Sequence, residues 1–315
     1  MDIFKELQDF LQNLENKKPL IVVLGPTASG KTALSLKIAK LYHGEIISTD
    51  SRQVYKYMDI GTDKILPPQQ EGVPHHLLDF LEPTEEFTLA DYKRLALKTI
   101  DEIYRRKHIP MLVGGTGLYI NAIIQNYQIP EVPPNPKLRQ EMTEFCEKNG
   151  IEALYKILQE KDPQAAKRIH PNNIRYVIRA LEINLAGNTR KIDTKGEPAF
   201  NVFVIGIDWP REELYARINQ RVDNQINRGL LNEFKTLLLK GYKETLPSMS
   251  SLGYKELGPF VRGECPLEEA VETIKQNTRN YAKRQLTWFK KYKNIHWIQG
   301  AELEKQDSGN KNPIS

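Results

Sequence analysis

Residues 19–32 read PLIVVLGPTASGKT, and this stretch decides the fold. Its first six residues, Pro19 to Leu24, form a short apolar run rich in β-branched side chains, which is typical of a strand buried in a parallel sheet. Residues 33–41 then repeat apolar side chains at helical spacing. A strand, a glycine-bounded turn and a helix in this order predict a phosphate-binding loop at the carboxyl end of the first strand.

The turn matches the pattern Gly-x-x-x-x-Gly-Lys-[Ser/Thr]. It comprises Gly25, Pro26, Thr27, Ala28, Ser29, Gly30, Lys31 and Thr32. Its glycines let successive N–H groups and the positive end of the helix face an anion, while Lys31 adds a full charge and Thr32 can coordinate Mg²⁺. Such loops usually hold a nucleoside triphosphate, so ATP is one expected ligand. A tight turn that binds nothing is disfavoured, because both flanking elements are predicted.

Two further strands, residues 45–49 and 109–113, make the fold class α/β: a P-loop NTPase-like parallel sheet flanked by helices, with its site at the carboxyl ends of the strands. The first of them runs into Asp50. This carboxylate could ligate Mg²⁺, act as a general base or cap the next helix, and on the residues alone the cap is favoured. The second ends in the glycine loop at 114–117, which offers no carboxylate and whose glycines would admit a substrate close to the backbone.

Residues 125–200 are expected to form an all-helical insertion. A proline-rich connector at 129–136 opens this segment, helical spacing follows, and strand character returns only at 201–207. Asn135 with Pro136, and Asp162 with Pro163, are pairs of N-cap and first-turn proline. Two long helices are expected near 211–240 and 266–293. The catalytic core would then comprise residues 1–124 and 201–298, and residues 299–315 would be a flexible tail.

Composition excludes several classes of protein. The 315 residues include 45 basic and 40 acidic side chains, which gives a net charge of +5, and two cysteines, Cys146 and Cys265, far apart in sequence. These numbers exclude a disulfide-stapled module and favour a reducing, cytoplasmic location. The acidic start of the chain and the lack of a long apolar run predict no signal peptide and no contact with a membrane. Without heptads or a large apolar stripe, we expect a monomer.

Arginines line one face of the helix expected after residue 210. Arg217, Arg221 and Arg228 recur at spacings of four and seven. A row of this kind on an arbitrary helix is usually a solvated face. Arginine at all three positions nevertheless favours an oxyanion, because its planar fork can bind phosphate through two hydrogen bonds.

Residues 275–293 contain seven Lys and Arg side chains and no acidic one, interleaved with Tyr281, Trp288, Phe289 and Tyr292. Clustered cations neutralise backbone phosphates and aromatic rings stack on bases, so this is the strongest nucleic-acid signal in the chain. An alternative of equal weight places Trp288 and Phe289 in the core and the lysines in water. The insertion carries a second basic set, namely Arg139, Lys167, Arg168, His170, Arg175 and Arg179. Two separated basic elements suggest a clamp.

Several motifs occur together in this chain. They are the phosphate loop at 25–32, DSRQVY at 50–55, MDIGT at 58–62, PHHL at 74–77, GGTGLY at 114–119 and GYKE at 253–256. In order and spacing this set resembles the tRNA dimethylallyltransferases, also called tRNA isopentenyltransferases, from about residue 19 to residue 298. Two departures are Asp63, where a small residue is expected, and Leu252 in place of isoleucine; neither coincides with a residue given a catalytic role. The lack of a zinc-finger extension favours the bacterial type.

The resemblance implies a reaction. A dimethylallyl group would pass from dimethylallyl diphosphate to the exocyclic amine of the adenosine at tRNA position 37, just 3′ of the anticodon, with Mg²⁺ bound through Thr32. The phosphate loop and Arg221 would hold the diphosphate leaving group rather than a nucleotide. Asp50 would accept the proton of the amine, and Thr116 and Arg217 would complete the catalytic set. The helical insertion, residues 125–200, would grip the tRNA anticodon stem-loop. The implied contacts with this stem-loop are Asp50, Ser51, Arg52, Gln53, Arg139, Arg175, Lys283 and Arg284.

Two other functions stay open on the residues alone. A P-loop kinase would use Asp50 to deprotonate a hydroxyl of a nucleoside or another acceptor while ATP occupies the loop, but it would leave the basic residues 275–293 without a role. A noncatalytic RNA-binding protein would keep the phosphate loop as a relic. In that case Asp50→Ala would leave its function unchanged.

Overall fold

The computed structural model describes residues 2–14, 18–130, 132–187 and 195–303. The chain forms two compact units, one of Met1–Ile124 with Ala199–Ser315 and the other of Gln125–Pro198. Among the described residues, no helix combines the length and the apolarity that crossing a membrane requires.

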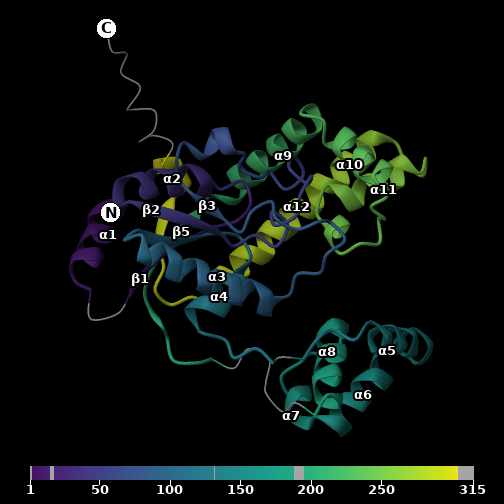
Figure 1. Ribbon diagram of the computed structural model, residues 1–315. Helices are drawn as coiled ribbons and strands as arrows, with labels where there is room; N and C mark the ends of the chain where they lie inside the picture. Colours follow the sequence, from purple (N-terminus) through teal and green to yellow (C-terminus); the bar gives the residue numbers. More distant parts are fainter. Residues whose placement is uncertain (1, 15–17, 131, 188–194, 304–315) are drawn as a thin grey trace. The chain divides into compact units, whose positions relative to one another are not determined.

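A parallel sheet forms the centre of the larger unit (Figure 1). In the described part of the chain it has six strands in the order β3-β2-β4-β1-β5-β6, and every neighbouring pair is parallel. The strands are β1 (Lys18–Leu24), β2 (Gly44–Ser48), β3 (His75–His76), β4 (Ile109–Gly114), β5 (Phe200–Asp208) and β6 (His296–Gln299). The predicted α/β class is confirmed. The short strands β3 and β6 were missed, because so few residues show no alternation.

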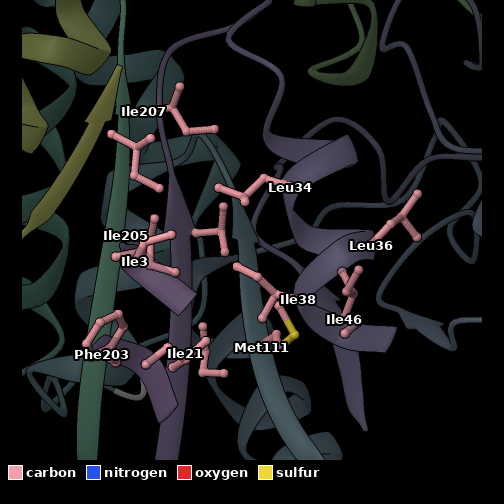
Figure 2. Packing of buried hydrophobic residues seen from close by; sticks show 14 of the residues in the cluster. Ile3, Ile21, Leu34, Leu36, Ile38, Ile46, Met111, Phe203, Ile205 and Ile207 are labelled. Atoms are coloured by element: carbon pink, nitrogen blue, oxygen red, sulfur yellow. The ribbon is translucent and has the colours of Figure 1, made fainter. Parts of the chain in front are cut away.

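Side chains of β1 alternate between two cores, one on each face of the sheet. Ile21 and Val23 pack with α1 (Ile3–Gln12) and α2 (Lys31–Tyr42), and Figure 2 shows the apolar side chains of this core between helix and strands. Leu20 and Val22 pack with α3 (Leu89–Arg105) and α4 (Gly117–Ile124) on the opposite face. Burial on both faces explains why β1 is a continuous apolar run.

Four further helices of the larger unit form a third core. They are α9 (Arg211–Asn227), α10 (Leu230–Leu239), α11 (Tyr254–Val261) and α12 (Leu267–Phe289), and they pack with residues 54–58. The prediction of one helix over 211–240 is wrong. Gly229, at φ +99°, lies between α9 and α10 in the left-handed conformation that glycine adopts without steric cost.

The smaller unit contains α5 (Pro136–Asn149), α6 (Ile151–Lys161), α7 (Pro163–Ala166) and α8 (Ile174–Leu185) around a core of its own. The two predicted caps are confirmed. The Asn135 side chain accepts a hydrogen bond from the N–H of Leu138 at 3.0 Å, and Asp162 accepts one from the N–H of Ala165 at 2.8 Å. These caps satisfy N–H groups that have no partner within the helix.

The end of the larger unit differs from the expected tail. Strand β6 extends to Gln299, residues 300–303 are helical, and Leu303 packs against the core of the larger unit. Residues 299–303 are therefore part of the fold. The rest of the expected tail, residues 304–315, lies outside the described residues.

Candidate active site

The phosphate loop joins the carboxyl end of β1 to the start of α2. Ala28 (φ +63°) and Gly30 (φ +91°) turn the chain, and a Cβ on Gly25 would lie 2.8 Å from the Ser29 hydroxyl. The Ser29 hydroxyl is buried and hydrogen-bonds no group in the described part of the chain. An unpartnered buried hydroxyl beside a helix N-terminus is suited to an anion, because a buried donor without a partner is costly.

Two arginines of α9 hold this loop. Arg217 Nε donates to the carbonyl of Ala28 at 3.0 Å, and Arg221 donates to the Thr27 hydroxyl at 2.5 Å. The structure thus brings both predicted arginines to the phosphate loop. Arg228, the third member of the row, instead pairs with Asp63 at 3.0 Å.

Lys31 lies partly buried at the first position of α2. Its Nζ donates to the carbonyl of Pro26 at 2.6 Å. Burial, and then the positive charge of Arg221, lower the pKa of Lys31 to about 7, although the carboxylate of Asp50 partly opposes both. The phosphate loop and Asp50 are therefore close enough to act on each other's charge.

Asp50 follows β2 and caps a turn. Its Oδ1 accepts hydrogen bonds from the N–H groups of Arg52 (2.8 Å) and Gln53 (3.4 Å). Asp50 was expected to cap a helix. That prediction is wrong, because the residues it caps, 51–57, form turns and not a helix. In the described part of the chain the second carboxylate oxygen has no hydrogen-bond partner, so it is available to an incoming group.

Thr116 and Tyr281 complete the surroundings of Asp50. The N–H of Thr116 donates to Thr49 O at 3.0 Å, and the Thr116 hydroxyl accepts from the N–H of Ser51 at 3.3 Å. The Tyr281 side chain lies close enough to the Thr116 side chain and to Asp50 for both to affect its pKa. Burial first, and then the negative charge of Asp50, raise the pKa of Tyr281 to about 12, so the phenol stays protonated. Tyr281 was predicted to stack on bases, so its place beside Asp50 was missed.

The glycine loop after β4 serves a different purpose from the one expected. A Cβ on Gly115 would lie 2.1 Å from Gln285 Nε2, and one on Gly117 would lie 2.2 Å from Trp288 Cδ1. Gln285 donates to the carbonyl of Gly115 at 3.0 Å and accepts from the N–H of Thr27 at 2.9 Å. These glycines therefore admit side chains of α12 and not a substrate. Tyr281, Gln285 and Trp288 recur at helical spacing, which is the signal that could have identified this face.

Some residues predicted to contact tRNA are engaged within the larger unit. The Arg52 guanidinium donates to the carbonyl of Pro247 (2.6 Å) and to the Ser250 hydroxyl (3.1 Å). Gln53 Nε2 donates to the carbonyls of Thr62 (3.1 Å) and Asp63 (3.3 Å). Both side chains fix the turns that follow β2.

Lys283 and Arg284 are exposed on α12, and neither has an ion-pair partner in the described part of the chain. Phe289 is fully buried, and the Tyr292 hydroxyl donates to Asn121. Of the two interpretations of residues 275–293, base stacking by Phe289 is thus wrong, whereas the exposed cations remain available to an anionic partner.

The two arginines singled out in the smaller unit differ. Arg139 forms two hydrogen bonds of 3.0 Å with Glu182, whose side chain is 1% exposed and also pairs with Arg179. Arg139 therefore neutralises a buried carboxylate. Arg175 is exposed and has no ion-pair partner among the described residues.

Metal-binding side chains do not converge in the described residues, which contain no group of three His, Cys, Asp or Glu side chains arranged to hold an ion. Thr32 is exposed in the first turn of α2. A divalent cation at this loop would therefore need oxygen ligands from a bound phosphate as well as the Thr32 hydroxyl.

A parallel sheet with a phosphate loop after β1, arginines from α9 and a free carboxylate oxygen after β2 defines a P-loop-like α/β enzyme that handles phosphates. The sequence model of the family described as IPP transferase matches residues 53–292. The chain belongs to this family.

Curated relatives and solved structures agree with this assignment. The chain is 48% identical over 288 residues to the tRNA dimethylallyltransferase of Bacillus licheniformis, covering 90% of this chain and 91% of the relative. It is 45% identical over 298 residues to that of Acetivibrio thermocellus, covering 93% and 95%. The full-length tRNA isopentenylpyrophosphate transferase of Bacillus halodurans matches at 42% identity and a TM-score of 0.69, over 93% of this chain and 96% of that one. A eukaryotic dimethylallyltransferase acting on tRNA matches at 30% identity and a TM-score of 0.76, over 93% and 76%.

Proposed function

We infer that the protein transfers a dimethylallyl group from dimethylallyl diphosphate to the exocyclic amine of the adenosine at tRNA position 37, releasing diphosphate. The observation that carries this inference is the pairing of an anion loop with a carboxylate, Asp50, that acts on the charge of Lys31. The named relatives support the transferase over a kinase that uses the same loop for ATP. With tRNA as the substrate, a cytoplasmic location is part of this proposal.

The phosphate loop is proposed to hold the diphosphate. Negative charge grows on the diphosphate as the allylic C–O bond breaks, and fixed donors around it lower the barrier. The proposed donors are the loop N–H groups, Ser29, Lys31, Arg217 and Arg221. The N–H of Thr27 is not among them, because it already donates to Gln285. Mg²⁺ held by Thr32 and diphosphate oxygens would supply further positive charge to the leaving group.

Asp50 is proposed to act on the nucleophile. Its free oxygen can accept the proton of the adenine amine as the new C–N bond forms, and a carboxylate orients that amine toward the carbon. Thr116 fixes the turn that carries Asp50 through the N–H of Ser51. The Tyr281 hydroxyl, which stays protonated, would provide a neutral hydrogen-bond donor near Asp50. The adenine must leave the stacked anticodon loop to reach this point.

Binding of the anticodon stem-loop is proposed for the exposed cations Lys283, Arg284 and Arg175. Each lacks an ion-pair partner in the described part of the chain and can neutralise a phosphate without breaking an existing bond. For Ser51, Arg52, Gln53 and Arg139 a contact with tRNA remains a proposal of lower priority. Arg52, Gln53 and Arg139 already hold the fold together.

Mass spectrometry of nucleosides tests the function. Unmodified tRNA is incubated with the protein and either dimethylallyl diphosphate or ATP. Prenylated adenosine in the first reaction only is the expected result, and phosphorylated product in the second would overturn the proposal. Asp50→Asn keeps the shape of the turn; it should slow transfer by about 10²- to 10⁴-fold while tRNA affinity stays within twofold.

A further inference from the structure

Asp63 lies beside the cations of the phosphate loop. Its Oδ1 accepts a hydrogen bond from Arg228 at 3.0 Å, and its Oδ2 lies 3.5 Å from Arg221 Nε. The far side of the same Arg221 guanidinium donates to the Thr27 hydroxyl. Arg221 is thus held between Asp63 and the phosphate loop. The departure at position 63 therefore does bear on the proposed site, contrary to the sequence expectation.

The cations around Arg221 explain why a carboxylate is useful there. Arg217 and Arg221 share one face of α9, Arg228 is the C-cap of this helix, and Lys31 is close enough for Arg221 to lower its pKa. Before an anion binds, this repulsion would drive the long Arg221 side chain away from the loop. A carboxylate on the outer side of Arg221 offsets that repulsion and leaves the inner side facing the loop.

Asp63 is itself well fixed. Its N–H donates to Ile60 O at 3.1 Å, and its carbonyl accepts from Gln53 Nε2 at 3.3 Å. Its φ of +52° lies in the left-handed region, which aspartate and asparagine tolerate better than most residues. With Arg228 holding the carboxylate as well, Asp63 provides a stable point against which Arg221 is oriented.

We propose that Asp63, anchored by Arg228, is a positioning residue that presents Arg221 to the diphosphate. Asp63 does not touch the substrate and acts only through the guanidinium. The identity of the anion rests on the proposed function. The positioning of Arg221 by Asp63 would affect the binding of any diphosphate in the phosphate loop.

The test measures binding of inorganic pyrophosphate with Mg²⁺ to the full chain by calorimetry, together with KM for dimethylallyl diphosphate and for tRNA. Asp63→Asn keeps the shape and the left-handed backbone. It should raise Kd for pyrophosphate and KM for dimethylallyl diphosphate by about two- to fivefold, as expected for a partly exposed ion pair, and leave KM for tRNA unchanged. Arg228→Gln should shift the same two constants in the same direction by a smaller factor.

Two controls isolate the effect. Asp101 lies on α3 and forms an exposed ion pair with Lys18 of β1. Asp101→Asn removes this carboxylate and should leave pyrophosphate binding unchanged. In an Arg221→Gln background, Asp63→Asn should have no further effect, because the two residues act as one unit.

Several outcomes would overturn the proposal. If Asp63 merely repels the anion, Asp63→Asn tightens pyrophosphate binding while Arg228→Gln weakens it. An Asp63→Asn effect that persists without Arg221, or a wild-type chain that binds no pyrophosphate, also overturns it. A chain that shows the predicted pyrophosphate constants but prenylates no tRNA leaves the role of Asp63 standing and removes only the proposed function.

Discussion

The two glycine-rich loops at the carboxyl ends of the neighbouring strands β1 and β4 have similar compositions but different roles. In residues 25–30, positive φ angles at Ala28 and Gly30 shape a turn in which the buried Ser29 hydroxyl has no partner in the described part of the chain. In residues 114–117, the space beside Gly115 and Gly117 is filled by α12. The number of glycines in a loop therefore does not show whether the loop binds an anion or packs against a helix.

Gln285 joins the two loops. Its side chain bonds the carbonyl of Gly115 at one end and the N–H of Thr27 at the other. The position of the phosphate loop thus depends on how α12 packs on the second loop. We expect the first loop to bind the diphosphate and the second loop to keep the first loop in position.

The largest expected effect is that of Lys31→Ala, which tests the first loop. We expect kcat/KM for dimethylallyl diphosphate to fall by about 10²- to 10³-fold, because a charge aimed at the leaving group is lost. The free energy of unfolding should stay the same or rise, since burial opposes the charged form of Lys31. Steady-state kinetics and urea unfolding measure both. Lys40→Ala, an exposed residue of the same helix paired with Glu71, is the matched control. Wild-type kinetics in Lys31→Ala would exclude this loop as the diphosphate site.

Alanine at the second loop should cost stability instead. Gly117→Ala brings a methyl group against the rigid indole of Trp288 and should lower the free energy of unfolding by about 1–3 kcal/mol. Gly115→Ala meets only the flexible end of Gln285, so its cost in stability should be smaller and its loss of transfer rate larger. Urea unfolding and transfer rates of both variants test this order. Equal stability losses in the two variants would contradict the assignment of the glycines.

The pH dependence of substrate binding tests the first loop more finely. Lys31, with a pKa of about 7 in the free protein, loses its charge as the pH rises above 7, and a diphosphate binds best to the charged form. KM for dimethylallyl diphosphate should therefore rise about fivefold between pH 7 and pH 8. Lys31→Gln should show a flat profile over this range. A wild-type KM that falls with rising pH would contradict the role of Lys31.

The first of the two glycine-rich loops could be predicted from the sequence, because it has a local sequence pattern. A β-branched run, the Gly-Lys-Thr ending and the following helical spacing identify β1, the phosphate loop and α2 within a few residues. The residues alone also singled out Asp50, Arg217 and Arg221, and the resemblance added Thr116 and a role for each. The structure brings all four to the carboxyl end of the sheet. The roles of these residues stay predictions.

What could not be predicted depends on partners distant in sequence. Tyr281 lies 165 positions from Thr116, and Gln285 lies 258 positions from Thr27. An aromatic residue in a basic helix has the same local pattern whether it stacks on RNA or lines a site. Likewise, the Arg139 pair with Glu182 and the Asp63 pair with Arg221 are set by tertiary packing, which no local spacing reveals.

The smallest expected effect concerns tRNA binding. Here the comparison is between cations that are paired within the protein and cations that are exposed to solvent. Replacing Lys283 and Arg284 together by Ala should weaken tRNA binding by less than about tenfold and reduce the slope of log K against log salt by about two at most. Fluorescence titrations at several salt concentrations measure the slope. An unchanged slope would assign both residues to a solvated face.

Arg139→Ala and Arg175→Ala provide the matched comparison in the smaller unit. Removing Arg175, which has no ion-pair partner in the described residues, should lower the salt slope by about one with no change in stability. Removing Arg139 leaves the buried Glu182 with fewer hydrogen bonds, so it should destabilise the fold and leave the slope nearly unchanged. If Arg139→Ala instead lowers the slope at constant stability, its pairing with Glu182 must exchange for a phosphate when tRNA binds. Arg139 would then belong with the exposed cations.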